Sequence, residues 1–385
     1  MPRLADIIAV LDRWFDPRWA QSWDAVGLVC GDPDEQVDRV LLAVDAVPKT
    51  VDETLSTGSQ LLVTHHPLLL TGVHGVPADD AKGSLVHRLI RGGAAHFVAH
   101  TNADVAAPGV SDALADVLGL HEVRPLEPQP DEAHDKLVAY VPAAHAQRLI
   151  DALAGAGAGA VGDYDRCAWT VQGVGTFRPL SGAQPTIGHI GDIEQVIETR
   201  VEMLVPIGRR QAVIQALRTA HPYQEPAFDL LAGSPVPGRR GTGRVGELAR
   251  PMPLREFVTN AAASLPATVG GLRAAGDPGR QVRTVAVCGG SGGPLCEQAR
   301  ACGADVFLTA DLKHHPAVEA VAERGGDAMA LVDAPHWATE APWLDAVAAR
   351  LRETLGTTVE VRVSRRVTDP WTLHAPSPES SEITE

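Results

Sequence analysis

The chain contains the stretch Leu61-Leu62-Val63-Thr64-His65-His66-Pro67, in which a short apolar run ends in two adjacent histidines. A short apolar run bounded by polar residues is typical of a buried strand. Open α/β sheets bind their ligands beyond the carboxyl ends of such strands. Consecutive residues of a strand point to opposite faces, so His65 and His66 can each bind a different ion. The alternative interpretation is a structural strand end with one surface histidine.

Two other apolar runs are also followed by side chains of metal-binding types. Residues 94–99 precede His100-Thr101-Asn102-Ala103-Asp104, and residues 328–332 precede His336-Trp337-Ala338-Thr339-Glu340. Imidazole and carboxylate groups together are ligands of zinc, manganese, iron and nickel. Three such stretches converging on one site predict a centre of two divalent metal ions.

Each of these candidates also has a structural interpretation. Asp104 is either a carboxylate that bridges two ions or an ordinary turn residue after asparagine. His100 is either a ligand or a hydrogen-bond donor that orients one, and we favour the donor. Pro342 predicts a helix that starts near residue 339, which leaves His336 in the preceding loop. Glu340 then lies in the first turn, where a glutamate also stabilises the helix dipole.

Two further stretches follow predicted strands. Residues 289–293, Gly-Gly-Ser-Gly-Gly, have the setting of a phosphate-binding loop but match neither Walker A nor GxGxxG. We interpret them as a tight turn, with anion binding as the alternative. Asp311 and His315 are candidates for orienting the metal ligands through hydrogen bonds, although Asp311 also fits a helix N-cap. Three scattered histidines without ligand spacing are interpreted as surface or structural residues: His145, His189 and His221.

The composition is that of a globular protein. Of 385 residues, 45% are hydrophobic and 21% are charged, and the formal net charge of −15 makes nucleic acid an improbable partner. No apolar run approaches the roughly 20 residues that span a bilayer, and the N-terminus lacks the pattern of a signal peptide. The five cysteines form no CxxC pair, which indicates free thiols in a reducing compartment. We therefore expect a cytoplasmic protein without a membrane partner.

Alternating strand and helix patterns in the two outer segments predict a largely parallel α/β sheet structure. Predicted strands cover residues 39–44, 60–63, 95–99, 282–288, 305–308, 328–332 and 359–363. Predicted helices cover residues 4–15, 50–55, 84–91, 112–118, 294–302, 316–324 and 343–355. Between these segments, residues 136–154 and 198–219 each read as a strand followed by a helix, which predicts a ferredoxin-like α+β insert.

Domain boundaries are predicted from proline and glycine. Pro125, Pro128 and Pro130 indicate the end of the first segment, and Pro235 to Gly243 an exit linker from the insert. The expected organisation is a core α/β part at residues 1–130, an insert at 131–243, and a second core part at 244–376. Residues 377–385 are polar and are predicted to be disordered.

The sequence resembles the Nif-three-like dinuclear metal protein family, also labelled GTP cyclohydrolase I type II homologs. The likeness begins at Trp23-Asp24-Ala25-Val26-Gly27-Leu28, extends to the closing helix, and includes the three histidine stretches. By that match the metal ligands would be His65, His66, Asp104, His336 and Glu340. Residues 162–165, 175–179 and 221–226 resemble the PII/CutA-like insert of the longer members. Three positions depart from the family pattern and predict altered loop geometry near the site: Ala25, Ala310 and Pro335.

The resemblance implies a two-metal centre and a toroidal homohexamer. The function that we expect is that of a metal-dependent hydrolase on a small nucleotide-like or phosphorylated substrate, with metal-bound water as nucleophile. A GTP cyclohydrolase-type reaction rests on the resemblance alone. Glu340 or Asp104 would bridge the ions. The alternative is a non-catalytic, metal-binding or regulatory assembly.

Overall fold

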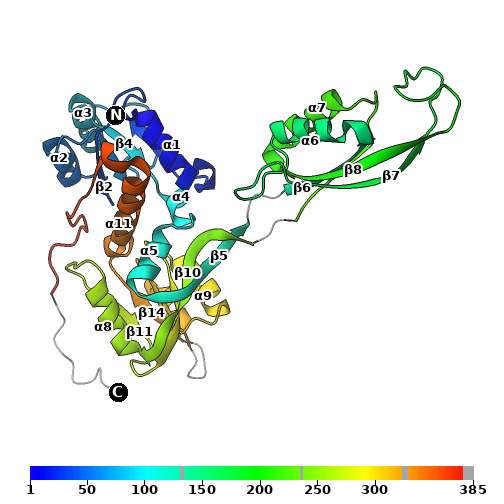
Figure 1. Ribbon diagram of the computed structural model, residues 1–385. Coiled ribbons are helices and arrows are strands. Elements are labelled where there is room, and N and C mark those ends of the chain that lie inside the picture. The colour runs from blue at the N-terminus through cyan, green and yellow to red at the C-terminus, as the bar shows by residue number, and fades with distance from the viewer. Residues whose placement is uncertain (131–133, 235–236, 323–327, 376–385) are drawn as a thin grey trace. The chain divides into compact units, whose positions relative to one another are not determined.

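The structure is a computed structural model that describes residues 1–130, 134–234, 237–322 and 328–375 (Figure 1). The chain divides into two compact units. The first unit combines Met1–Gln129 with Arg239–Glu385, and the second is Pro130–Gly238. The tail predicted to be disordered, residues 377–385, lies outside the described residues.

The first unit contains a five-stranded sheet with the strand order β1-β4-β3-β2-β15. Four of its strands are parallel, and β1 runs antiparallel to β4 at one edge. The strands are β1 (Gly27–Cys30), β2 (Arg39–Ala43), β3 (Leu61–Thr64), β4 (Ala95–Val98) and β15 (Glu360–Val363). All residues of β3 and β4 are buried, as expected for central parallel strands with both faces covered.

A second, six-stranded sheet of the same unit has the order β11-β14-β13-β12-β10-β5. Its strands are β5 (Leu120–Pro130), β10 (Pro237–Pro253), β11 (Arg273–Ala275), β12 (Gln281–Val287), β13 (Val306–Thr309) and β14 (Ala330–Asp333). β12, β13 and β14 are parallel, whereas β10 and β11 pair antiparallel with their neighbours. The predicted mixed α/β class is therefore confirmed.

Helices cover both sheets of the first unit. They are α1 (Leu4–Trp14), α2 (Pro48–Ser56), α3 (Ala81–Arg91), α4 (Thr101–Asp104), α5 (Val110–Val117), α8 (Leu254–Ser264), α9 (Cys296–Ala301), α10 (His314–Val321) and α11 (His336–Leu355). One hydrophobic cluster includes Val40 and Val63 of the first sheet, Val285 and Leu308 of the second, and Leu344 of α11. The two sheets therefore share a core, and α11 contacts α5, β2 and β15 (Figure 1).

Two predicted boundaries turn out to be strands. The proline-rich segment from Pro125 to Pro130 lies in β5, at the edge of the second sheet. An edge strand tolerates proline because the missing N–H can face away from the ladder. The predicted linker from Pro235 to Gly243 largely coincides with the start of β10, the partner of β5 in the sheet. Proline and glycine counts could not show this pairing between segments about a hundred residues apart.

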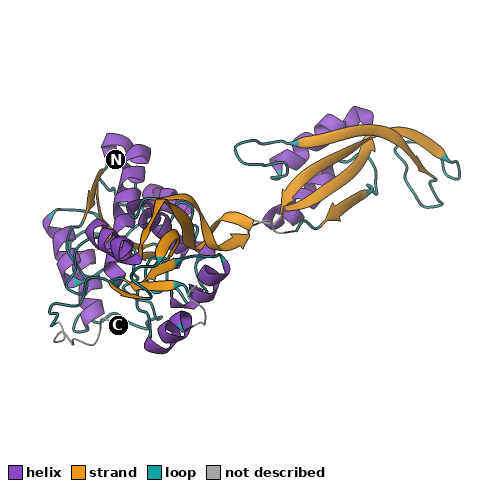
Figure 2. Ribbon diagram, turned by 90° about the horizontal axis from the view of Figure 1, so that it is seen from below, coloured by secondary structure: helices purple, strands orange, loops and turns teal. Residues whose placement is uncertain are grey.

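The second unit contains a four-stranded antiparallel sheet with the order β7-β8-β6-β9 (Figure 2). Its strands are β6 (His134–Pro142), β7 (Ala168–Phe177), β8 (Glu194–Pro206) and β9 (Phe228–Leu231), and its helices are α6 (Ala146–Gly155) and α7 (Arg210–Ala220). The chain order is strand, helix, two strands, helix, strand. The sequence pattern reveals β6, α6, β8 and α7 but misses β7 and β9. The ferredoxin-like assignment of this unit stays a prediction.

A helix that spans a bilayer needs about 20 predominantly apolar residues. None of the helices of the described residues is both long and apolar enough to meet this requirement.

Candidate metal centre

The carboxyl ends of three neighbouring parallel strands supply half of the site. Asp45 follows β2, His65 and His66 follow β3, and His100 follows β4. Parallel strands end at the same edge of a sheet, so these side chains are brought together. His65 and His66 lie in a bend beyond β3, and the expected alternation to opposite faces does not hold there. Their rings are 5.1 Å apart and both approach the carboxylate of Glu340.

The other half of the site comes from the first turns of α11. The predicted helix start near residue 339 is wrong: α11 begins at His336 and carries Pro342 in its interior. Interior proline costs about 3 kcal/mol, but Trp337 and the following turn are buried against the core. Burial of this turn offsets that cost. Because His336 and Glu340 are four residues apart on a helix, they share one face, with His336 Nε2 2.9 Å from Glu340 Oε1.

Glu340 lies at the middle of the site and is only 3% exposed. Its Oε2 is 3.0 Å from His66 Nε2, and its Oε1 is 3.5 Å from His65 Nε2. His65 Nε2 is also 3.6 Å from Asp104 Oδ1, which α4 delivers from the chain after His100. The structure thus brings together all five residues that the sequence predicts as ligands.

Four imidazoles of the site are held in the same way, each through its Nδ1. His66 donates to Asp45 Oδ1 (2.7 Å), His100 to Asp24 Oδ1 (2.8 Å) and His336 to Asp311 Oδ2 (2.6 Å). His65 donates to the carbonyl oxygen of Ala99 (2.9 Å). An imidazole that donates from Nδ1 keeps Nε2 available as a ligand with a fixed ring orientation. The carboxylates of Asp24, Asp45 and Asp311 therefore fix the orientation of three of these rings.

In the metal-free site, burial and neighbouring charges shift the pKa values of the ionisable side chains. Burial alone would raise the pKa of Glu340, but the surrounding histidines hold it well below 4.5. Burial alone would lower the pKa values of the histidines, but Glu340 with Asp45 raises that of His66 to about 11. Glu340 with Asp311 raises that of His336 to about 9. Burial raises the pKa of the Asp104 carboxyl. In the metal-free site the protonated histidines balance the negative charge of Glu340, and a divalent cation can supply that positive charge instead.

The positions of the donor atoms in this site fit a bound metal ion. His65 Nε2 is a buried atom without a hydrogen-bond partner, which is costly in a folded protein, and it lies 3.5 Å from Glu340 Oε1 and 3.6 Å from Asp104 Oδ1. Within the described residues, two groups have ligand atoms within 4.8 Å of one another at this site. One is His65, His66 and His100, and the other is His66, His336 and Glu340. Nitrogen and carboxylate donors at these separations fit borderline divalent metals.

The glycine-rich loop of residues 289–293 packs against this site. Its N–H groups are used by hydroxyls of the protein: Gly289 donates to Ser111, Gly290 to Thr339 and Gly292 to Thr309. This pattern favours the tight turn over an anion-binding loop. Gly290 has a φ of +65°, and a Cβ on it would lie 2.5 Å from Glu340 Oε1 and 3.1 Å from His336 Nε2. Only glycine allows the loop to approach the ligands so closely.

A cavity of about 930 Å³ opens beside the imidazoles. The cavity is lined by three imidazoles of the site, those of His66, His100 and His336. Its apolar lining includes Trp337, Trp371 and Leu373. Arg273, Asp311, Asp369 and His374 also line it. Its size suits a small-molecule site. Oδ2 of Asp369 is buried without a hydrogen-bond partner, so this cavity holds a carboxylate in addition to the candidate ligands.

A family model described as Duf34/NIF3 (NGG1p interacting factor 3) matches residues 2–370 of the chain. The chain belongs to the Duf34/NIF3 family. The resemblance drawn from the three histidine stretches is thereby confirmed.

Curated relatives and solved structures match most of the chain. A Mycobacterium leprae (strain TN) protein named GTP cyclohydrolase 1 type 2 homolog is 51% identical over 374 residues, covering 97% of this chain and 96% of that protein. A Bacillus subtilis (strain 168) protein of the same name is 36% identical and covers 82% and 84%. A solved Bacillus cereus structure, titled as related to NIF3, is 34% identical with a TM-score of 0.78, covering 97% and 99%. A Staphylococcus aureus structure is 27% identical with a TM-score of 0.82 and the same coverage.

Some Duf34/NIF3 site residues of this chain were missed or misplaced by sequence reasoning. Asp24 and Asp45 were not predicted, although Asp45 follows a strand as His65 does. Asp24 is fully buried and accepts hydrogen bonds from His100 and from the backbone N–H and hydroxyl of Thr101. Those hydrogen bonds and the charge of His100 lower the pKa of Asp24 despite its burial.

The remaining candidates divide into those near the site and those elsewhere. Asp311 accepts from His336 as described above, with a φ of +56°. His315 is exposed at the start of α10, where its ring packs against His314 at 5.3 Å. His221 is buried in the second unit, and His189 lies near Asp192 and Glu194 on its surface. At the departure from the family pattern before α11, Pro335 has a φ of −60°, which suits proline.

Proposed function

We propose that this chain binds two divalent metal ions and uses them to hydrolyse a small phosphorylated or nucleotide-like compound. The observation that carries the proposal is the shared anchoring of four imidazoles. Each Nδ1 donates to a fixed acceptor, and the rings of His65, His66 and His336 face the buried carboxylate of Glu340. Histidines that bind metals almost always donate their other ring N–H to a carboxylate or a backbone carbonyl, as all four do here.

Six residues would hold the ions in this proposal: His65, His66, His100, Asp104, His336 and Glu340. Glu340 has one oxygen toward His66 and the other toward His65 and His336, so it fits a bridging role. We include His100 because its ring lies 5.1 Å from that of His65 and Asp24 orients it. When bound, such a metal pair lowers the pKa of coordinated water and stabilises negative charge on a reacting oxygen.

The cavity supports a catalytic role over mere metal storage. Asp369 lies in the same cavity as His66 and His336 but belongs to neither ligand group. Its partnerless Oδ2 can accept a proton from the attacking water or return one to the leaving group. Arg273 and His374 line the cavity and provide donors for a phosphoryl group. The names of the relatives suggest a purine nucleotide, and we propose that class as the first to screen.

The test is metal content per chain by mass spectrometry for gently purified wild type and His66→Ala. We expect close to two ions in the wild type and at most one in the variant. His315→Ala is the matched control, since the structure places that histidine on exposed α10, and it should retain both ions. Little metal in the wild type after reloading with zinc, manganese, iron or nickel would refute the proposal.

A hydrolase screen then separates the enzyme from the alternative, a non-catalytic metal-binding or regulatory assembly. Metal-loaded protein is incubated with nucleotides and phosphate esters, and release of phosphate or formate is measured. The alternative is favoured if two ions bind and nothing turns over. The family resemblance also leads us to propose a homohexamer, which light scattering coupled to size-exclusion chromatography tests directly.

A further inference from the structure

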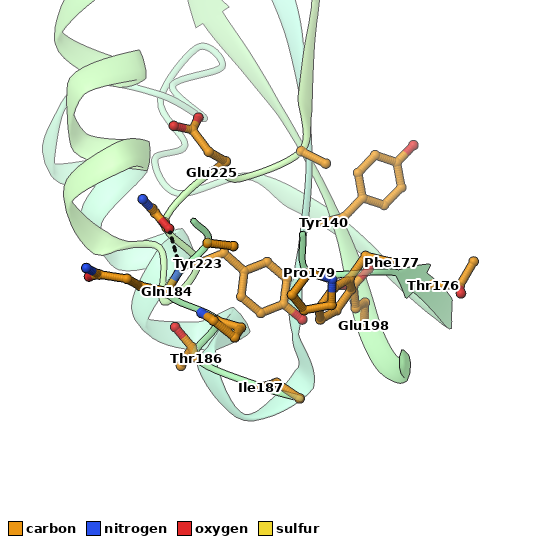
Figure 3. A pocket seen from close by; sticks show the side chains of 15 residues that line it. Tyr140, Thr176, Phe177, Pro179, Gln184, Thr186, Ile187, Glu198, Tyr223 and Glu225 are labelled. Carbon is orange, nitrogen blue, oxygen red and sulfur yellow. Dashed lines mark hydrogen bonds between the residues drawn. The ribbon is translucent and has the colours of Figure 1, made fainter. Parts of the chain in front are cut away.

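The second unit contains a cavity of about 340 Å³ that the proposed metal chemistry does not use (Figure 3). Its walls come from β6, β7, β8, the segment after β7 and the turn after α7. Two stretches that stood out in the sequence, residues 175–179 and 221–226, supply much of its lining. Its volume lies at the small end of the range for ligand pockets.

Aromatic and apolar side chains make up most of the wall. Phe177 and Tyr223 meet edge to face with ring centroids 5.6 Å apart. Tyr140 also lines the cavity, but the guanidinium of Arg200 already lies over its ring, 5.9 Å from the centroid. Pro179 and Ile187 line the same space, and Figure 3 shows the Tyr223 ring directed toward Pro179 and Phe177. Faces of aromatic rings carry partial negative charge and attract cations.

A carboxylate without a countercharge lies in this aromatic setting. Glu198 of β8 is half-buried, and among the described residues no basic side chain forms an ion pair with it. Arg200, two residues further along β8, pairs instead with Glu202 at 2.9 Å. A Cβ on Gly175 would lie 2.0 Å from Glu198 Oε2, so only glycine at this position leaves the carboxylate its place.

The nearby histidine does not neutralise Glu198 either. His221 Nδ1 accepts from the backbone N–H of Tyr223, and its Nε2 donates to the carbonyl oxygen of Tyr140. Both ring nitrogens are thus engaged as in the neutral imidazole. Burial also lowers the pKa of His221. The hydroxyl of Tyr223 is buried beside Glu198, and burial together with this carboxylate raises the pKa of the Tyr223 phenol.

Polar residues at the rim add negative charge but no positive charge. Glu225 lines the cavity, and Gln184 and Gln224 are joined by a hydrogen bond of 3.1 Å from the Gln184 backbone N–H. The described lining contains two glutamates and no lysine or arginine. Aromatic rings around an uncompensated carboxylate favour a positively charged guest.

We infer that this cavity binds a small organic cation, an amine whose charged nitrogen pairs with Glu198 and whose apolar part lies against Phe177 and Tyr223. The Tyr223 hydroxyl, which lies beside Glu198, would share that carboxylate with the bound amine. This inference does not depend on the metal centre, since no residue is shared between the two sites.

The experiment is isothermal titration of the full-length chain with three probes of similar shape: benzylamine, benzyltrimethylammonium and benzyl alcohol. We expect both cations to bind at least tenfold more tightly than the neutral alcohol. Glu198→Gln keeps the shape of the side chain and removes its charge, so it should weaken benzylamine binding at least tenfold. Gly175→Ala should have a similar effect by displacing the carboxylate.

Glu225→Gln is the matched control, because it removes a rim charge and should change binding less than twofold. Thermal unfolding of each variant establishes that the second unit still folds. The inference is overturned if the cations bind no better than benzyl alcohol, or if Glu198→Gln binds benzylamine as the wild type does. Absence of binding by either cation at 10 mM, roughly the weakest affinity worth calling a site, also overturns it.

Discussion

Substituting Gly290 by alanine should weaken metal binding at least tenfold while leaving the fold in place. The added Cβ would lie 2.5 Å from Glu340 Oε1 and 3.1 Å from His336 Nε2, and ordinary contact begins at 3.4 Å. Glu340 would therefore have to retreat by about 0.9 Å. Metal–ligand distances tolerate about 0.2 Å, so a displacement of this size removes the carboxylate from the position that the imidazoles define.

The energetic effect on folding is modest by comparison. Gly290 has a φ of +65°, and a left-handed conformation costs an alanine about 1–2 kcal/mol. The atoms that must move are the end of a glutamate side chain and an imidazole, with no backbone atom among the nearest three. We therefore expect a folded protein with metal affinity lowered at least tenfold, the usual effect of disturbing a ligand's support.

Metal content by mass spectrometry and affinity by competition with a chelator measure the effect. Gly293→Ala is the control from the same loop, because a Cβ there would meet only Leu312, at 3.9 Å. It should bind metal as the wild type does. Full metal affinity in Gly290→Ala, with the fold intact, would refute the assignment of Glu340 as a ligand.

Three further predictions follow from the geometry. Asp24→Asn should weaken metal binding about 10- to 100-fold through loss of the acceptor for His100, and an unchanged chelator titration would contradict this. Asp369→Asn should leave two ions bound but lower the turnover of any hydrolysed substrate about 10²- to 10⁴-fold; equal rates would remove Asp369 from the chemistry. The metal-free protein should lose stability as the pH rises. Glu340 with Asp311 raises the pKa of His336 from 6.5 to about 9, and Glu340 with Asp45 raises that of His66 to about 11. Protonation of these two histidines therefore stabilises the folded state fully below pH 6.5, and this stabilisation is lost as the pH rises through their folded-state pKa values. Thermal unfolding in chelator from pH 6.5 to 10.5 tests this, and a flat profile would count against it; Glu340→Gln should flatten the profile.

Local pattern was sufficient for the central strands and the candidate ligands. β3, β4 and β14 are apolar runs buried on both faces, and such runs are visible in sequence because burial demands apolar side chains. His65 and His100, which follow β3 and β4, lie at one edge of the sheet because parallel strands end together. This rule and the residue types predicted a two-metal site, whereas the set of five candidate ligands came from the family resemblance.

The sequence did not reveal which acceptor each histidine of the site contacts in the folded chain. Asp24 is 76 residues from His100, and Asp311 is 25 from His336, so no spacing rule links donor and acceptor. The start of α11 was also mispredicted, because local propensity favours a later start before Pro342 whereas core burial of Trp337 favours an earlier one. Long-range packing decided between them.

The sequence by itself determined the α/β class, the strand ends and the chemical types of the candidate ligands. Tertiary structure alone decided that β10 and β5 form a sheet in place of a linker, and that a glycine loop presses on Glu340. It also decided that each imidazole is oriented by an acceptor elsewhere in the chain. The physical reason is that burial and backbone direction leave periodic traces in sequence, whereas hydrogen bonds between distant segments depend on the shared core that brings them together.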